Sequence, residues 1–138
     1  MLRKIAVEML KKHEGLRLKP YRCTAGKLTI GYGRNLEDVG ISEKEALQML
    51  KHDVNSYREL LTARYQWFES LSTDRKAVCI NMAFNLGMRG FHGFRRMRRC
   101  LKQGDYPQAV IEMLDSKWAK QVGYRATELA QIMEEGKL

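Results

Sequence analysis

The segment from Ala77 to Leu86 (AVCINMAFNL) is apolar on nearly every side, and it constrains the fold more than any other part of the chain. A helix of this composition has no polar face to turn towards water, so other elements must surround it. We therefore expect it at the centre of a helix-rich lobe. Gly87 is expected to end this helix, because glycine readily adopts the left-handed conformation that closes many helices.

Helical patterns continue downstream of this segment. Asp105 is placed to cap one helix, and Pro107 falls in its first turn, where the missing N–H costs nothing. The remainder predicts two more short helices that are broken near Gly123. Before Asp105, a basic helix is predicted with four apolar residues on one face, namely Phe91, Phe94, Met97 and Leu101.

Upstream, the pattern changes from helical to extended. Apolar residues recur at helical spacing from Leu2, and Gly15 predicts the end of that helix, with Glu14 in its last turn. Residues 16–33 alternate in polarity around the sequence TAG and predict a small β-hairpin.

The length of the hairpin loop decides which side chains share a face. A three-residue loop at residues 24–26 makes Cys23 face Lys27 and places it diagonal to Thr29. A two-residue loop pairs Cys23 with Leu28 instead. The sequence leaves both geometries open.

A long amphipathic helix is predicted from about residue 43 to residue 62. Ser42 and Glu45 have the spacing of a capping box at its start. Apolar residues then follow at intervals of three and four: Leu47, Leu50, Val54, Tyr57 and Leu61. We expect this helix to link two lobes of one domain that spans residues 1–138, a size at which a single sizeable core can form.

Charge and cysteine content narrow the class of partner and site. With 25 Lys and Arg against 16 Asp and Glu, the net charge is +9, which favours a polyanionic partner such as nucleic acid, an anionic membrane or an acidic cell-wall polymer. The three cysteines are widely spaced, with no CxxC pair and no cluster of histidines, so they predict free thiols rather than a zinc site. No cofactor or metal is implied.

Glu14 is the one acid between residues 13 and 33. A carboxyl group in the last turn of a helix faces the negative end of the helix dipole, which favours its protonated form. This suits a general acid. Taken alone, however, a glutamate before a glycine is more often an ordinary surface residue at a helix end.

Three separated segments resemble the phage-type lysozymes, the bacteriophage endolysins of glycoside hydrolase family twenty-four. EGLRLKPY, Cys23 and GKLTIGYG are similar to the catalytic segment of that family, in which a Glu is followed nine residues later by Asp or Cys, and six residues after that by Thr. INMAFNLG (residues 80–87) and SKWAKQVGYRA (residues 116–126) resemble its central helix and its closing segment. In the better known members the middle position is Asp, so Cys23 is a departure from them.

The resemblance implies an α+β, mostly helical, lysozyme-like fold with a small hairpin lobe, a long linking helix and a helical lobe. It implies hydrolysis of the β-1,4 bond between N-acetylmuramic acid and N-acetylglucosamine in peptidoglycan, with Glu14 as the acid and Thr29 bound to the attacking water. Phe84 and Asn85 are implied near the sugars, and Arg125 near the catalytic glutamate as an ion-pair candidate.

The role of Cys23 stays open among base, water-positioning group and nucleophile. An ordinary thiol has a pKa of about 8.5, so Cys23 is expected to be a weak base unless Arg22 or Lys27 lowers that value. We predict that Cys23 and Thr29 position the attacking water.

Two other function classes compete with the enzyme. A nucleic-acid-binding helical domain would use the basic helix on phosphates, but it explains neither the glycine-rich hairpin nor the spacing of Glu14, Cys23 and Thr29. A wall-binding module without catalysis, or a protein whose basic helices disrupt membranes, is the second rival.

We expect a monomer that binds peptidoglycan and no nucleic acid, and whose basic residues 95–102 contact an anionic surface of the cell envelope. The N-terminal sequence has the character of neither a signal peptide nor a membrane span. The resemblance therefore implies accumulation in the host cytoplasm, followed by release to the wall through a membrane lesion made by a holin.

Overall fold

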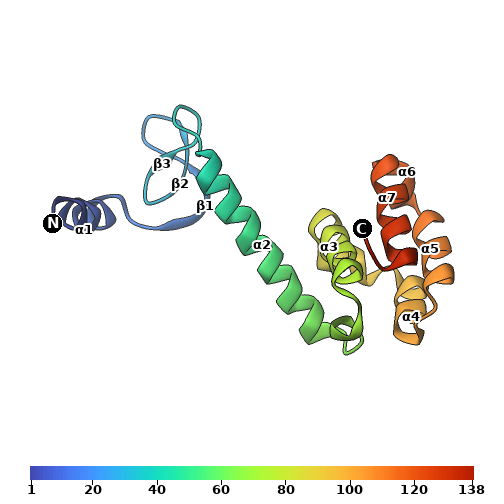
Figure 1. The fold of residues 1–138 in the computed structure, drawn as a ribbon. Helices are drawn as coiled ribbons and strands as arrows, with labels where there is room; N and C mark the ends of the chain where they lie inside the picture. Colours follow the sequence, from blue (N-terminus) through green and yellow to red (C-terminus); the bar gives the residue numbers. More distant parts are fainter. The chain divides into compact units, whose positions relative to one another are not determined.

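The computed structural model describes residues 1–138 as seven α-helices, one short 3-10 helix and three strands (Figure 1). This confirms the mostly helical α+β composition. None of the helices combines the length and the apolar character that a membrane span requires. The elements are α1 (Leu2–Glu14), β1 (Arg17–Arg22), β2 (Leu28–Gly31), β3 (Arg34–Asn35), α2 (Glu43–Arg64), η1 (Phe68–Ser70), α3 (Thr73–His92), α4 (Arg95–Gln103), α5 (Tyr106–Leu114), α6 (Lys117–Val122) and α7 (Tyr124–Glu135).

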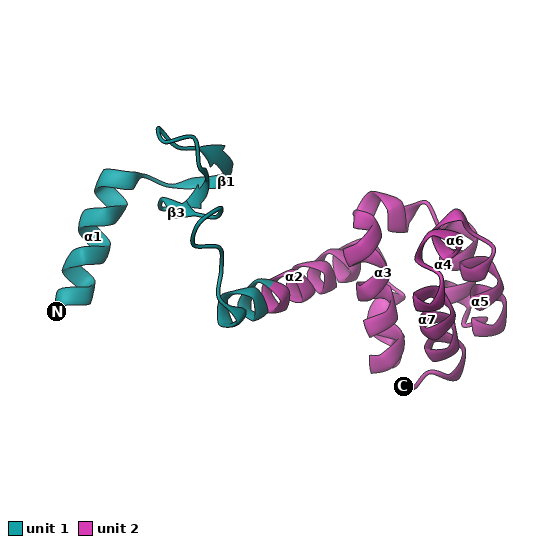
Figure 2. Ribbon diagram, turned by 90° about the horizontal axis from the view of Figure 1, so that it is seen from above, with its two compact units in different colours: residues 1–49 teal, residues 50–138 magenta.

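The chain divides into two compact units, unit 1 (Met1–Met49) and unit 2 (Leu50–Leu138), coloured separately in Figure 2. The boundary lies within α2, the helix that the sequence predicts as the link between two lobes. The assignment of residues 1–138 to one catalytic domain stays a prediction.

Unit 1 contains α1 and a three-stranded antiparallel sheet in the order β1-β2-β3. The three-residue loop between β1 and β2 is confirmed, because the Cys23 N–H donates to the Lys27 carbonyl at 3.0 Å and Arg22 pairs with Leu28. The sequence did not predict β3, which has only two residues and therefore shows no alternation of polarity. It pairs with β2 through Thr29 and Asn35.

The start of α2 has the predicted capping box. The Glu45 N–H donates to Ser42 Oγ at 3.1 Å, and the Ser42 N–H donates to Glu45 Oε1 at 2.9 Å. The same carboxylate accepts two hydrogen bonds from Arg34, at 2.9 and 2.7 Å, which hold its pKa at about 2. These bonds fix the chain from β3 to the first turn of α2.

The core of the protein lies in unit 2, where the central helix α3 packs with the helices that follow it. Ser72 caps α3 by accepting from the Arg75 N–H, and Gly87, with φ of 75°, interrupts the helix as predicted. One face of α3 differs from the prediction of burial on nearly all sides, since Phe84 is 44% exposed. Its buried residues, apart from Phe91, lie on the opposite side: Val78, Cys79, Met82 and Ala83.

The C-terminal helices pack closely on one another, with α5 against α4 and α7, and α7 also against α3 and α6 (Figure 1). Asp105 caps α5 by accepting from the Gln108 N–H, and Pro107 lies in the first turn, as predicted. Met97 and Leu101 are buried on the inner face of α4. Gly123 separates α6 from α7.

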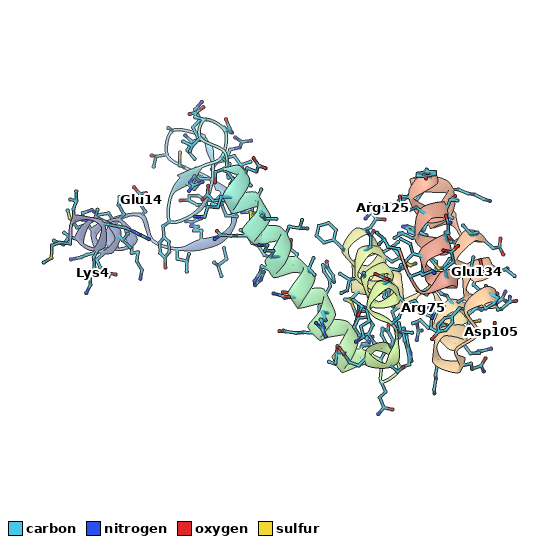
Figure 3. All side chains as sticks on the ribbon, viewed as in Figure 1. Lys4, Glu14, Arg75, Asp105, Arg125 and Glu134 are labelled. Atoms are coloured by element: carbon cyan, nitrogen blue, oxygen red, sulfur yellow. The ribbon has the colours of Figure 1, made fainter.

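Arg75 joins three helices of unit 2. Its Nε donates to the Met133 carbonyl at 2.7 Å and its Nη2 to the Glu134 carbonyl at 2.8 Å, so it caps the last turn of α7 (Figure 3). Its guanidinium carbon also lies 3.4 Å from the centre of the Tyr106 ring at the start of α5. A cation near the C-terminal carbonyls of a helix is favourable because it opposes the helix dipole.

Candidate functional site

Glu14 is the last residue of α1 and is exposed, with Gly15 immediately after it at φ of 71° (Figure 3). Its carboxyl group lies against the backbone of Gly33, in the turn between β2 and β3. A Cβ at position 33 would lie 2.9 Å from Glu14 Oε2, and Gly33 has φ of +80°. The positive φ favours glycine at this position, and a Cβ there would oblige the Glu14 side chain to move.

Replacing Gly33 by Ala is expected to displace the Glu14 side chain and to lower catalytic activity by about 10-fold to 10²-fold, because small displacements of a reacting group are costly. Gly31→Ala is the matched control. Gly31 also has a positive φ, of +71°, but a Cβ there would meet nothing within 4 Å. Both variants should lose about 1 to 2 kcal/mol of stability from the strained conformation. Equal activities of the two variants would contradict a role for the Gly33 contact.

Cys23 and Thr29 come together at the loop end of the hairpin, as the three-residue loop predicts. Thr29 is 3% exposed, and its Oγ1 donates to the Lys27 carbonyl at 2.8 Å. The pKa of the Cys23 thiol is lowered, chiefly by the backbone N–H of Lys27 and next by that of Ala25. The thiolate form is therefore favoured relative to an ordinary cysteine.

The cause of this lowered pKa corrects one expectation. The sequence predicts a weak base unless the positive charge of Arg22 or Lys27 lowers the pKa, whereas in the structure hydrogen bonds from the loop lower it. Arg22 is paired with Glu37 at 2.7 Å, and Lys27 lies 3.4 Å from Asp38. Each cation is thus directed to a carboxylate.

The other two thiols are small core residues, as predicted. Cys79 and Cys100 are buried. Burial raises the pKa of Cys79 to about 12, and burial followed by the nearby charges of Asp105 and Glu112 raises that of Cys100. Of the three cysteines, only Cys23 combines partial exposure with a lowered pKa.

The remaining predicted site residues belong to unit 2. Phe84 packs edge-on against Tyr57, with ring centres 6.0 Å apart, and lines one apolar pocket together with Arg125. Asn85 accepts a hydrogen bond from Trp118 Nε1 at 2.8 Å. The sequence predicts no partner for Asn85 and no role for Trp118.

Arg125 is held by an asparagine that the sequence analysis did not single out. Its Nε and Nη2 donate to Asn81 Oδ1 at 3.0 and 2.6 Å. Asn81 and Asn85 are the two polar residues of the apolar segment 77–86, and a polar side chain in such a segment was the available signal. The ion pair between Arg125 and Glu14 stays a prediction.

The described geometry provides two kinds of group within unit 1. One is a carboxyl group at a helix end, seated on a glycine turn. The other is a thiol and a hydroxyl that share the loop end of the hairpin. Hydrolysis of a glycosidic bond requires a group to protonate the leaving oxygen and a second group to handle water or to bond to the sugar, and these residues have the corresponding chemistry.

Comparisons with known proteins agree with this chemistry. The family model described as phage lysozyme matches residues 11–132. An endolysin of Acyrthosiphon pisum secondary endosymbiont phage 1 is 34% identical over 81% of this chain and 75% of its own length. "Probable T4-type lysozyme 2" of Dictyostelium discoideum is 24% identical over 95% of this chain and 94% of its own length. The pre-baseplate central spike protein Gp5 of Enterobacteria phage T4 is 28% identical over 95% of this chain, which covers 28% of that larger protein. The chain therefore belongs to the phage lysozyme family.

Proposed function

We propose that this lysozyme, a glycoside hydrolase of peptidoglycan, cleaves the β-1,4 bond between N-acetylmuramic acid and N-acetylglucosamine, with Glu14 as the general acid. The observation that carries the proposal is the seating of Glu14 on Gly33, where a Cβ would lie 2.9 Å from its carboxylate oxygen. The carboxyl group thus lies beside the turn that follows β2, the strand that contains Thr29, and Cys23 lies in the loop that precedes this strand.

Cys23 and Thr29 are proposed to hold the water that attacks the anomeric carbon. The Thr29 hydroxyl is fixed by its bond to the Lys27 carbonyl, which leaves its oxygen lone pairs as acceptors. A thiolate is also an acceptor, and the loop N–H groups favour that form of Cys23. A water bound by two acceptors presents its own oxygen lone pair away from them. The expected outcome is inversion at the anomeric carbon.

Phe84 and Asn85 are proposed to contact the sugar chain, and Arg125 to pair with the acid. The exposed ring of Phe84 supports the proposed contact with the sugar chain, because a large apolar side chain that is 44% exposed is available for a ligand. The bond from Trp118 fixes the oxygen of the Asn85 amide and leaves its NH₂ group free to donate.

Turbidity clearing of a peptidoglycan suspension, measured together with the release of reducing ends, tests this function against its rivals. A hydrolase clears the suspension and releases reducing ends in proportion. Binding to the wall without new reducing ends would indicate a wall-binding module. Salt-dependent binding to duplex DNA without sugar chemistry would indicate a nucleic-acid-binding domain.

The exposed side of α4 is proposed to contact anionic phosphate groups of the cell envelope. Four cations lie on that side and belong to none of the ion pairs of the structure: Arg95, Arg96, Arg99 and Lys102. Arg98 differs from them, since its Nε donates to the His92 carbonyl at 3.0 Å and it faces the Tyr65 ring. Arg98 is therefore proposed to stabilise the fold of unit 2 and not to bind the cell envelope.

Replacing these four exposed cations of α4 by Gln is expected to weaken binding to whole anionic cell walls by about 10-fold or more at low salt. Cleavage of small soluble wall fragments should be nearly unchanged, since surface charge acts on the encounter with an extended polyanion. A variant with the same change of net charge at four dispersed exposed lysines is the control: Lys44, Lys51, Lys117 and Lys120. Equal losses in the two variants would show that only net charge matters.

We also propose that the protein acts from inside an infected bacterium and lyses the host cell after a holin opens the inner membrane. Wall digestion by added enzyme, compared in intact cells and in cells with a permeabilised inner membrane, tests the route. Expression of the chain in bacteria should cause lysis only when the membrane is opened. Lysis without any membrane lesion would contradict the route and leave the chemistry untouched.

A further inference from the structure

One carboxylate oxygen joins the two strands of the hairpin beside the proposed catalytic residues. Glu37 Oε1 accepts from Arg22 Nη1 at 2.7 Å and from the Leu28 N–H at 2.9 Å. Arg22 is the last residue of β1 and directly precedes Cys23, and Leu28 directly precedes Thr29 on β2. Glu37 itself lies beyond β3, so a third segment of unit 1 binds both strands of the hairpin next to Cys23 and Thr29.

Arg22 also binds the loop between β1 and β2. Arg22 Nη1 also donates to the Gly26 carbonyl at 3.0 Å, which ties the loop to the carboxylate through one guanidinium. The loop is the segment whose Lys27 and Ala25 N–H groups favour the thiolate of Cys23. The Gly26 carbonyl and the Lys27 N–H belong to one peptide group, so the orientation of the Lys27 N–H depends on bonds that converge on Glu37.

An exposed ion pair alone would be a weak restraint, and the Arg22 side chain is 65% exposed. The hydrogen bond from the Leu28 N–H to Glu37 adds a stronger restraint. A hydrogen bond from an N–H to an ionised carboxylate is shorter and stronger than a neutral one, and here it fixes the main chain of β2 directly. The two bonds from Arg22 and Leu28 also hold the pKa of Glu37 below its usual range, so the carboxylate is charged near neutral pH.

We propose that Glu37 is a positioning residue for the reaction, which holds the hairpin loop so that Cys23 and Thr29 bind the attacking water. This inference rests on the proposed function for the role of those two residues. Glu37 does not touch the substrate in this account. It acts through Leu28, Arg22 and the loop between them.

The test uses Cys23 itself as the reporter. The rate of alkylation by iodoacetamide is followed against pH in the native protein, where Cys79 and Cys100 are buried. In Glu37→Leu the loop N–H groups lose their support, so the alkylation profile should move to higher pH. The kcat for wall hydrolysis should fall by about 10-fold, with little change in KM. Glu37→Gln keeps an acceptor oxygen and should lie close to the unaltered protein on both readouts.

The direction of the shift separates positioning from a simple effect of charge. Removing a nearby negative charge stabilises a thiolate and would move the profile of both variants to lower pH. That result, or an unchanged profile in Glu37→Leu, would overturn the proposal. Asp38→Asn is the matched control, because it removes the neighbouring carboxylate, which contacts Lys27 at 3.4 Å and no backbone N–H of β2. It should leave both readouts unchanged.

Two further measurements test the restraint without relying on a variant that folds, and distinguish its failure from a failure of the proposed function. In the unaltered protein, the Leu28 amide proton should shift as Glu37 titrates and should exchange slowly with solvent. Rapid exchange of that amide would overturn the proposal. An alkylation profile shifted to higher pH with unchanged kcat would keep the loop restraint but remove Cys23 from the reaction, which contradicts the proposed function instead.

Discussion

Replacing Glu14 by Gln is expected to lower the rate of peptidoglycan hydrolysis by about 10² to 10⁴-fold, since that is the typical contribution of a general acid. Gln has nearly the same shape as Glu but cannot supply the proton. Glu14 is exposed and lies outside the core, so thermal unfolding should be unchanged. The rate of release of reducing ends from purified wall measures the effect.

The control for this variant is Glu8→Gln, which changes an exposed acid on the same helix. Glu8 lies 4.0 Å from Lys11 and contacts nothing in the sheet that would place it in the reaction. It should retain full activity. Near-normal turnover by Glu14→Gln would remove Glu14 from the role of acid, whatever the behaviour of the control.

Alkylation of Cys23 with iodoacetamide is expected to abolish activity, with a loss of about 10²-fold or more, because the added group occupies the place of the attacking water. The lowered pKa of this thiol moves its reaction to lower pH than that of an ordinary cysteine. Cys79, with a pKa of about 12, should stay unmodified in the folded protein. Mass analysis of the modified protein checks that a single site has reacted.

Cys23→Asp should stay active and should be insensitive to iodoacetamide, since a carboxylate can hold or activate the same water. Proton NMR of the first product then reports the mechanism. An α-anomer supports water positioning and inversion. An initial β-anomer, or a sugar adduct trapped on Cys23, would show covalent catalysis and overturn the assigned role.

The sequence predicted best those features that depend on local rules. Gly15 and Gly87 interrupt helices where expected, and Ser42 and Asp105 cap helices where expected, because these effects involve residues only a few positions apart. The hairpin loop was undecided between two lengths, and the Cys23 to Lys27 bond resolves it.

Features that depend on contacts between distant segments were missed. Nothing near Glu37 in the sequence indicates that its carboxylate binds Arg22, fifteen residues earlier, or the Leu28 N–H. The apolar pattern likewise missed the exposed face of α3, because burial depends on which neighbours cover a face, and only the resemblance placed Phe84 near the sugars. Phe84 is an example, since an apolar residue can line a pocket as readily as it can fill a core.

This lysozyme is proposed to hydrolyse the β-1,4 bond that leaves N-acetylmuramic acid at the new reducing end, with Glu14 as the acid. Mass spectrometry of borohydride-reduced products from purified peptidoglycan tests it most directly. We expect the unaltered protein and Glu8→Gln to give products whose reduced end is muramitol, and Glu14→Gln to give almost none. A reduced glucosamine end would mean that the other glycosidic bond is cut, and anhydro-muramic ends, one water lighter, would mean that no water attacks. Either product would contradict the account.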